Sequence, residues 1–131
     1  MSLSVVNGTT LVGSVGVNAQ TGTTYTFAAA DGFNTVVTLS NASAIAVTIP
    51  TNATTAFPVG TVLNFAQTGA GQVTVSGASG VTVTSNGATA ASPKTRVQYS
   101  AGSAIQTSAN NWLVIGAVSY THLTLPTKRI V

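Results

Sequence analysis

The sequence contains very few residues that can carry chemistry. Its 131 residues include four Lys and Arg, one acidic residue, one His and no Cys. Up to position 117 the only charged residues are Asp31, Lys94 and Arg96. Proton transfer, metal binding and nucleophilic attack all depend on such groups, or on a base that activates a hydroxyl. We therefore expect no catalytic, cofactor-binding or metal-binding residues, and a protein that is not an enzyme.

Other absences exclude further classes of protein. The lack of Cys excludes a disulfide framework, and no apolar run approaches the roughly 20 residues of a membrane-spanning helix. Residues 1–7 lack the charged start and long apolar stretch of a signal peptide, so export would need another route, such as release of virus particles by lysis. Two of the four bases, Lys128 and Arg129, lie at the C-terminus, and the remaining two cannot form the basic patch that binds nucleic acid.

The last residues differ in composition from the rest of the chain. Gly and Ala, which are frequent before this point, are absent from residues 118–131, and the only His, His122, lies there. Residues 118–127, with the sequence VSYTHLTLPT, resemble one reading frame through the transposon-end adapter used in sequencing libraries. We therefore expect residues 118–131 to be a non-native tail that is set aside in fold reasoning. A natural basic tail is the alternative.

What remains is rich in Thr, Val, Ala, Ser, Asn and Gly, in short alternating runs that are typical of β-strands. Turn residues separate these runs about every ten residues, and no helical period persists. The pattern predicts an all-β fold, an antiparallel β-sandwich or jelly-roll-like barrel of about 8–10 short strands. The expected strands cover residues 11–17, 23–27, 34–39, 46–49, 61–67, 72–76, 81–84, 95–99, 104–107 and 112–115.

Two of these strands are expected to form a hairpin with one apolar and one polar face. Residues 73, 75, 81 and 83 are all Val, whereas residues 74, 82 and 84 are all Thr, and alternate residues of a strand share a face. Residues 51–59 and 86–93 are expected to be loops. We expect an N-terminal segment or first strand at 1–16, one β-sandwich domain at 17–117 and the tail at 118–131.

Four residues are candidates for contact with a ligand or surface. Lys94 and Arg96 lie two apart, so on a strand they would share a face and could bind an anion or a sugar. Trp112 and Tyr99 could form an aromatic platform for a sugar ring, or they could fill the core of a domain that is poor in large residues. Asp31 precedes Gly32, where an Asp side chain commonly bonds the backbone two residues on, and we assign it to turn formation.

Five stretches of the chain resemble a β-domain that recurs in virion proteins of tailed phages, including tail fibres and other tail structural proteins. Their order and spacing agree across nearly the whole of residues 17–117, and Asp31-Gly32 stands where such domains often follow an aspartate–glycine turn. The stretches are residues 18–27, residues 39–43 running into 47–50, residues 56–61, residues 67–74 and residues 109–116.

The resemblance implies a non-enzymatic virion structural protein without a cofactor, which assembles with copies of itself, by analogy with fibres as a trimer. Its partners would be other virion proteins and a host surface glycan, and it would reach the outside of the cell in the virion. Residues 51–60 and 86–94 would contact the host surface or a neighbouring subunit. The low charge agrees with assembly, because it leaves little repulsion between copies.

Two other functions fit the sequence. A carbohydrate-binding adhesion module would use Trp112, Tyr99 and Arg96 on one face. A capsid decoration protein would bind the lattice of the phage head instead of the tail. A carbohydrate-binding module predicts retention on polysaccharide, and a decoration protein predicts purification with heads.

Overall fold

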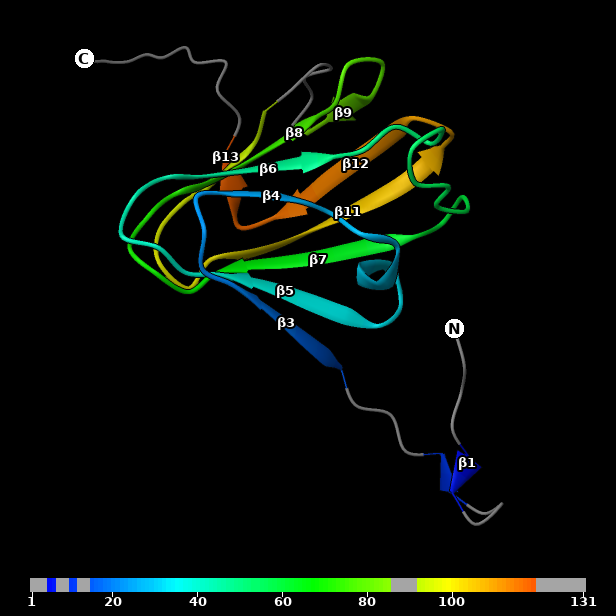
Figure 1. The fold of residues 1–131 in the computed structure, drawn as a ribbon, viewed down its shortest axis with the longest axis horizontal. Helices are drawn as coiled ribbons and strands as arrows, with labels where there is room; N and C mark the ends of the chain where they lie inside the picture. The colour runs from blue at the N-terminus through cyan, green and yellow to red at the C-terminus, as the bar shows by residue number, and fades with distance from the viewer. Residues whose placement is uncertain (1–4, 7–9, 12–14, 86–91, 120–131) are drawn as a thin grey trace, which may run out of the picture.

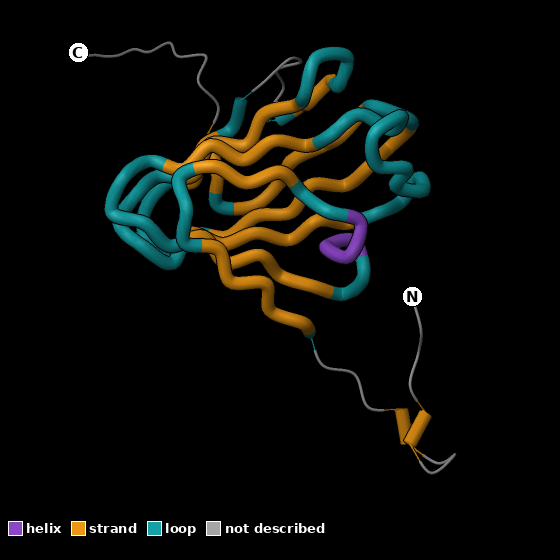
Figure 2. Tube along the Cα trace, in the orientation of Figure 1, coloured by secondary structure: helices purple, strands orange, loops and turns teal. Residues whose placement is uncertain are grey.

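A computed structural model describes residues 5–6, 10–11, 15–85 and 92–119. These residues form thirteen strands and one short 3₁₀ turn, and eleven of the strands build two sheets that pack face to face (Figures 1 and 2). The predicted all-β class is confirmed. The single 3₁₀ turn, which covers four residues, is the only helix in the described ranges, and none there is long and apolar enough to cross a membrane.

The strands are distributed over the two sheets as follows. The larger sheet has six strands, in the order β3 (Gly16–Gln20), β5 (Thr35–Leu39), β7 (Val62–Gln67), β11 (Ala101–Ser108), β12 (Asn111–Gly116) and β9 (Thr82–Thr84). The smaller sheet has five strands, in the order β13 (Val118–Ser119), β10 (Lys94–Thr95), β8 (Val73–Gly77), β6 (Ile45–Ile49) and β4 (Thr24–Thr26). Outside the sheets, β1 (Val5–Val6) pairs with β2 (Thr10–Leu11), and the 3₁₀ turn η1 (Ala29–Gly32) lies between β4 and β5.

In the first half of the domain the strands follow a helical path, which we call the coil, instead of forming hairpins. From β3 to β8 the chain passes alternately between the two sheets, so that β3, β5 and β7 are parallel neighbours, as are β4, β6 and β8. Antiparallel pairing is confined to β1 with β2 and to β7, β8, β10, β11, β12 and β13. The expectation of an antiparallel sandwich or jelly roll is therefore wrong in its pairing, because each large sheet is mixed. Between β3 and β8, the crossover that each parallel pair requires is supplied by a strand of the opposite sheet.

The turns at one end of the coil are stacked on each other through backbone and amide hydrogen bonds. Asn41 Nδ2 donates to the Thr21 carbonyl at 2.7 Å, and the Gly71 N–H donates to the Asn41 carbonyl at 2.7 Å. A Cβ atom on Gly71 would lie 1.8 Å from the Ser43 carbonyl oxygen, so this position has no room for a side chain. The close approach of the turns holds successive coils in register (Figure 1).

The core lies between the two sheets and is built by alternation along each strand. Val73, Val75 and Val83 are buried and Val81 packs against them, which confirms that these four valines face the core. The predicted hairpin is nevertheless wrong, because β8 belongs to the smaller sheet and β9 pairs in parallel with β12 of the larger one. The turn between them carries the chain across the core.

Some strand boundaries differ from the prediction. The strand expected at 95–99 is shortened to β10, because the chain turns at Val97–Ser100, where the Ser100 N–H donates to the Val97 carbonyl at 3.0 Å. The strand expected at 11–17 is displaced to β3. The domain boundary set at residue 117 falls inside the fold, because Val118 is buried in the core and β13 pairs with β10.

Candidate interaction site

The only acidic residue, Asp31, is buried in a hydrogen-bonded network at the end of the coil. Its carboxylate accepts hydrogen bonds from Tyr25 Oη at 2.5 Å, from Asn18 Nδ2 at 3.0 Å and from the Ala28 N–H at 2.8 Å. The Asn18 amide also accepts a hydrogen bond from Gln20 Nε2 at 2.8 Å. The assignment of Asp31 to local structure agrees with these contacts, although its backbone partner lies three residues before it rather than two after.

This network keeps the Tyr25 hydroxyl protonated over an extended pH range. Burial, followed by the hydrogen bond to Asp31 and the charge of that carboxylate, raises the pKa of Tyr25 to about 12. Both oxygens of the Asp31 carboxylate accept hydrogen bonds from donors of the protein itself. Among the described residues there is also no group of three His, Cys, Asp or Glu that could hold a metal ion.

Trp112 belongs to the core and does not form a sugar platform. Its side chain is 2% exposed, and it meets Phe57 edge to face with ring centroids 5.5 Å apart. The proposed surface pairing of Trp112 with Tyr99 is therefore wrong. The alternative interpretation of Trp112 as core filling is confirmed. Phe57 is the buried residue of the 51–60 loop and holds that loop against the domain.

Tyr99 is the opposite case, because it projects from the 96–100 turn into solvent. Its side chain is 77% exposed, and its backbone adopts a positive φ of 69°, which non-glycine residues rarely adopt. The turn is fixed by a hydrogen bond from the Tyr99 N–H to the Gln67 carbonyl at 2.6 Å and by one from Gln98 Nε2 to the Thr68 carbonyl at 3.0 Å. An aromatic ring is thus presented to solvent on a well-anchored turn.

The two basic residues differ in their surroundings. Lys94 is half-buried in β10, and its Nζ donates to Thr74 Oγ1 at 3.2 Å. Arg96 is exposed and lies past the end of β10, so the expectation that Lys94 and Arg96 share one strand face is wrong. Arg96 is in the same turn as Val97 and Tyr99, whose side chains are also exposed. We name residues 96–100 the tip turn.

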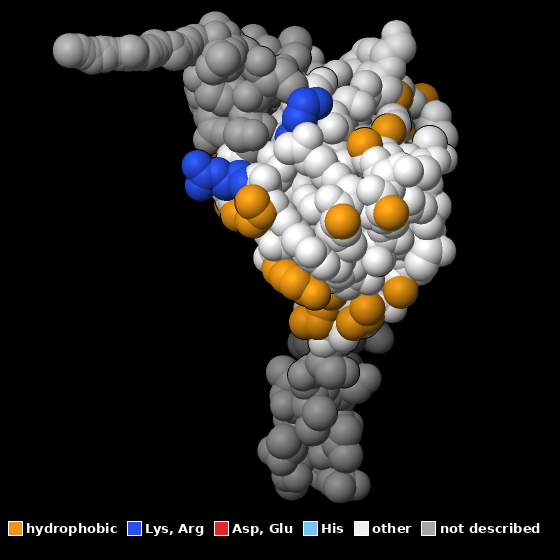
Figure 3. Space-filling view, turned by 90° about the vertical axis from the view of Figure 1, so that its left-hand side faces the viewer, with side chains coloured by type: hydrophobic (Ala, Val, Ile, Leu, Met, Phe, Trp, Pro, Cys, Tyr) orange, Lys and Arg blue, Asp and Glu red, His pale blue; other side chains and the backbone are white. Residues whose placement is uncertain are grey.

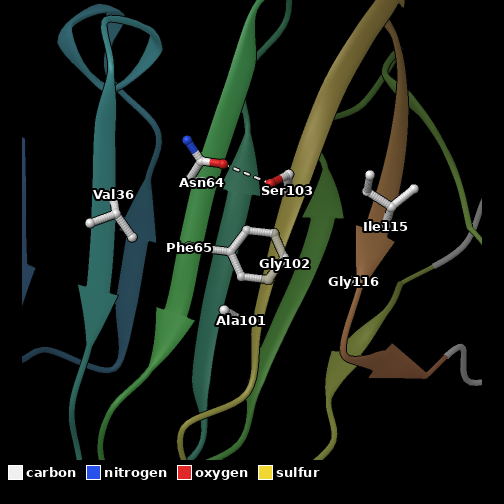
Figure 4. A pocket seen from close by; sticks show the side chains of 8 residues that line it. All are labelled: Val36, Asn64, Phe65, Ala101, Gly102, Ser103, Ile115 and Gly116. Atoms are coloured by element: carbon white, nitrogen blue, oxygen red, sulfur yellow. Dashed lines mark hydrogen bonds between the residues drawn. The ribbon is translucent and has the colours of Figure 1, made fainter. Parts of the chain in front are cut away.

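Sequence reasoning missed the outer face of the six-stranded sheet. One row of paired residues crosses it from β3 to β12, namely Val17, Val36, Asn64, Ser103 and Ile115. Val17 is 67% exposed and Ile115 is 46% exposed. A shallow groove of about 280 Å³ runs along the row, and at its centre Ser103 Oγ donates to Asn64 Oδ1 at 2.6 Å (Figure 4). The signal was the alternation of β5, β7 and β11, whose outward positions carry small or apolar side chains.

Several predicted features lie outside the described residues. These are His122, Lys128 and Arg129 of the expected tail and the part of the second contact loop at 86–91. A comparison of the chain with models of known protein families and with curated proteins found no match.

Proposed function

We propose that this chain is a non-enzymatic structural protein of a tailed-phage virion, a tail fibre or tail-associated module that acts by assembly and surface contact. The observation that carries the proposal is the character of the surface. Within the described residues Asp31 is buried, so Lys94 and Arg96 are the charged side chains that remain, while Val15, Val17 and other apolar side chains are exposed. Figure 3 shows one face on which apolar side chains are scattered among uncharged ones. Such a surface offers little electrostatic repulsion to association with copies or other virion proteins.

The engagement of Asp31 supports the non-enzymatic part of the proposal. The carboxylate accepts three hydrogen bonds, from Asn18, Tyr25 and the Ala28 N–H, and so connects β3 to β4 and to the segment that follows β4. The fold itself, two packed sheets around an apolar core, agrees with a mechanical role but does not specify it.

Labelling of phage particles tests this proposal. An antiserum against the full chain would be applied to tailed phages from a sample that carries the gene, and bound antibody would be located by electron microscopy. Label on the tail is the expected result. Label on the head would favour the capsid decoration protein, and particles that carry the gene but bind no antibody would contradict a virion role.

A second candidate function, glycan binding, is favoured by the tip turn. Exposed aromatic rings stack on sugar rings, and a positive φ at a non-glycine residue is a strained arrangement that clusters at functional sites. Tyr99 and Arg96 would supply the contacts, without Trp112. Retention on host polysaccharide that is lost in Tyr99→Ala, while the melting temperature is kept, would support glycan binding. Equal retention of both proteins would contradict it.

A further inference from the structure

Both large sheets end, on the same side of the molecule, in a strand whose outer edge pairs with no other described strand. β3 is the last strand of the six-stranded sheet, and β4 is the last strand of the five-stranded sheet (Figure 1). The two strands are successive in the chain and form the first turn of the coil. They also face each other across the core, because Asn18 Nδ2 of β3 donates to Tyr25 Oη of β4 at 2.8 Å.

The hydrogen bonds toward the sheet interior identify the backbone groups that remain open. The Gly16 N–H donates to the Asn34 carbonyl at 2.9 Å, and the Gln20 carbonyl accepts from the Ser40 N–H at 3.0 Å. Successive residues of a strand turn their N–H and C=O groups to opposite sides. Residues 16, 18 and 20 therefore face β5, whereas the backbone groups of Val17 and Ala19 point away from the sheet.

In β4, too, alternate residues point their backbone groups away from the neighbouring strand. The Thr23 carbonyl accepts from the Ala46 N–H at 2.8 Å, and the Phe27 N–H donates to the Thr48 carbonyl at 3.1 Å. Residues 23, 25 and 27 thus face β6, and the backbone groups of Thr24 and Thr26 are turned outward. Each sheet consequently presents two outward-facing residues, with two donors and two acceptors, at this end.

Within the part of the chain that the structure describes, neither edge carries a device that prevents pairing with another chain. Natural sheets protect their edges with Lys, Pro, bulges or covering segments. Residues 15–27 contain no charged residue and no Pro, and the pairing of β3 with β5 and of β4 with β6 is regular. The nearby charge, Asp31, is buried behind the strands.

We propose that these two edges form the contact between two copies of the chain, which pair antiparallel about a two-fold axis. The axis passes midway between Asn18 and its counterpart in the second copy, and likewise between Tyr25 and its counterpart, which are the central residues of β3 and β4. Val17 then lies opposite Ala19 of the second copy and Thr24 opposite Thr26 of the second copy, and each strand pair forms four hydrogen bonds. The inference deepens the proposed function and rests on it, because it names the surface through which assembly occurs.

A second copy is the occupant that this end fits best. A two-fold axis perpendicular to the layers joins an edge to its own copy, so β3 and β4 are completed by one operation. The side chains of Val17 and Ala19 are exposed on the outer face of the larger sheet, and the pairing would place them beside the same two side chains of the second copy. Two uncharged edges meet without electrostatic repulsion.

Disulfide cross-linking tests the register directly, because the chain has no native Cys. Residues in a hydrogen-bonded antiparallel pair have Cα atoms about 5.5 Å apart, within the range that a disulfide spans. A mixture of full-length Val17→Cys and Ala19→Cys proteins should therefore form a covalent dimer under mild oxidation. Either variant alone should not, since its two cysteines would lie beyond about 7 Å.

Edge-blocking variants test the same contact without a covalent bond. Ala19→Pro removes an outward N–H, which an edge strand tolerates, and Val17→Lys adds a charge at the pairing edge. Ala19→Pro should weaken self-association by at least about tenfold, because each copy loses one hydrogen bond of the contact. Val17→Lys should weaken self-association because it brings the same positive charge of both copies to one contact. The matched control is Thr82→Lys, which adds the same charge to β9, the edge strand at the other end of this sheet. The three variants should keep the circular dichroism spectrum and the melting transition of the wild-type protein.

The outcomes separate this inference from the proposed function. Cross-linking of the mixture together with weaker association of the edge variants supports the two-fold contact. A protein that self-associates but shows no mixed disulfide and no effect of Ala19→Pro or Val17→Lys overturns this contact, and assembly then uses another surface. A protein that stays monomeric and forms no mixed disulfide overturns both the contact and self-assembly.

Discussion

At the scale of single residues, burial determines which side chains can contact a ligand, and the burial of Trp112 and Tyr99 was only partly predictable from the sequence. Trp112 and Tyr99 are both aromatic residues next to turn signals, and the sequence left both roles open for each. The structure separates them because Trp112 alternates inward on β12, whereas Tyr99 sits at a turn that ends β10 early. Local alternation could have placed Trp112, but the positive φ at Tyr99 depends on its hydrogen bond to Gln67, which is distant in sequence.

Replacing Trp112 tests its place in the core. Trp112→Ala removes a buried ring and its contact with Phe57, so we expect a loss of about 3–5 kcal/mol in the free energy of unfolding. Urea denaturation measures this. Tyr99→Ala is the control and should unfold at about the wild-type midpoint, because its ring is exposed. A Trp112→Ala protein of wild-type stability would contradict the core assignment.

Replacing Tyr25 tests the buried network. Because the pKa of Tyr25 is raised to about 12 in the fold and is 10.0 in the free side chain, the neutral hydroxyl is favoured by folding. The resulting contribution to the free energy of unfolding is fully present below pH 10 and is lost as the pH rises through 12. We expect about 1 kcal/mol of stability to be lost over that interval, after allowance for partial exposure of the ring.

The measurement compares wild type with Tyr25→Phe. The variant lacks the titrating hydroxyl, so its stability should fall less between pH 10 and pH 12, although it starts lower because the hydrogen bond to Asp31 is missing. Parallel pH dependence of the two proteins in chemical denaturation would count against the raised pKa.

At the scale of elements, the strands were largely predictable and their partners were not. The predicted ranges for β5, β6, β7 and β12 overlap the observed strands closely, because period-two alternation depends only on local sequence. Which strands pair depends on how many residues the chain needs to cross to the other sheet and come back. The coil measures 19 residues from Val17 to its partner Val36 but 28 residues from Val36 to Asn64, so no constant repeat is visible in the sequence.

The stacked turns offer a test of the coil. Gly71→Ala would drive a Cβ into the Ser43 carbonyl and force two turns apart, so we expect a loss of at least about 2 kcal/mol. Gly22→Ala is the matched control from the first of the three stacked turns. Its Cβ would meet the Thr24 carbonyl at an ordinary 3.7 Å, and its melting temperature should change little. Equal melting temperatures for the two variants would refute the close stacking of turns.

At the scale of the whole molecule, composition was more informative than any motif. The scarcity of charge predicts little electrostatic repulsion between copies, and the described surface carries few charged and several exposed apolar side chains. The location of such a surface could not be read from composition, because it depends on which strands stand at the edges. β3 became an edge only through the crossover to β4, which links two sheets that the sequence does not distinguish.

The mass of the full chain in solution tests the central claim of assembly most directly. Light scattering coupled to size-exclusion chromatography would be run over a wide range of protein concentrations. Self-assembly predicts a mass that rises with concentration from that of one 13.0 kDa chain to a multiple of it, which is twice that mass for the two-fold contact. A mass of one chain at every concentration, from a protein with an intact melting transition, would contradict it.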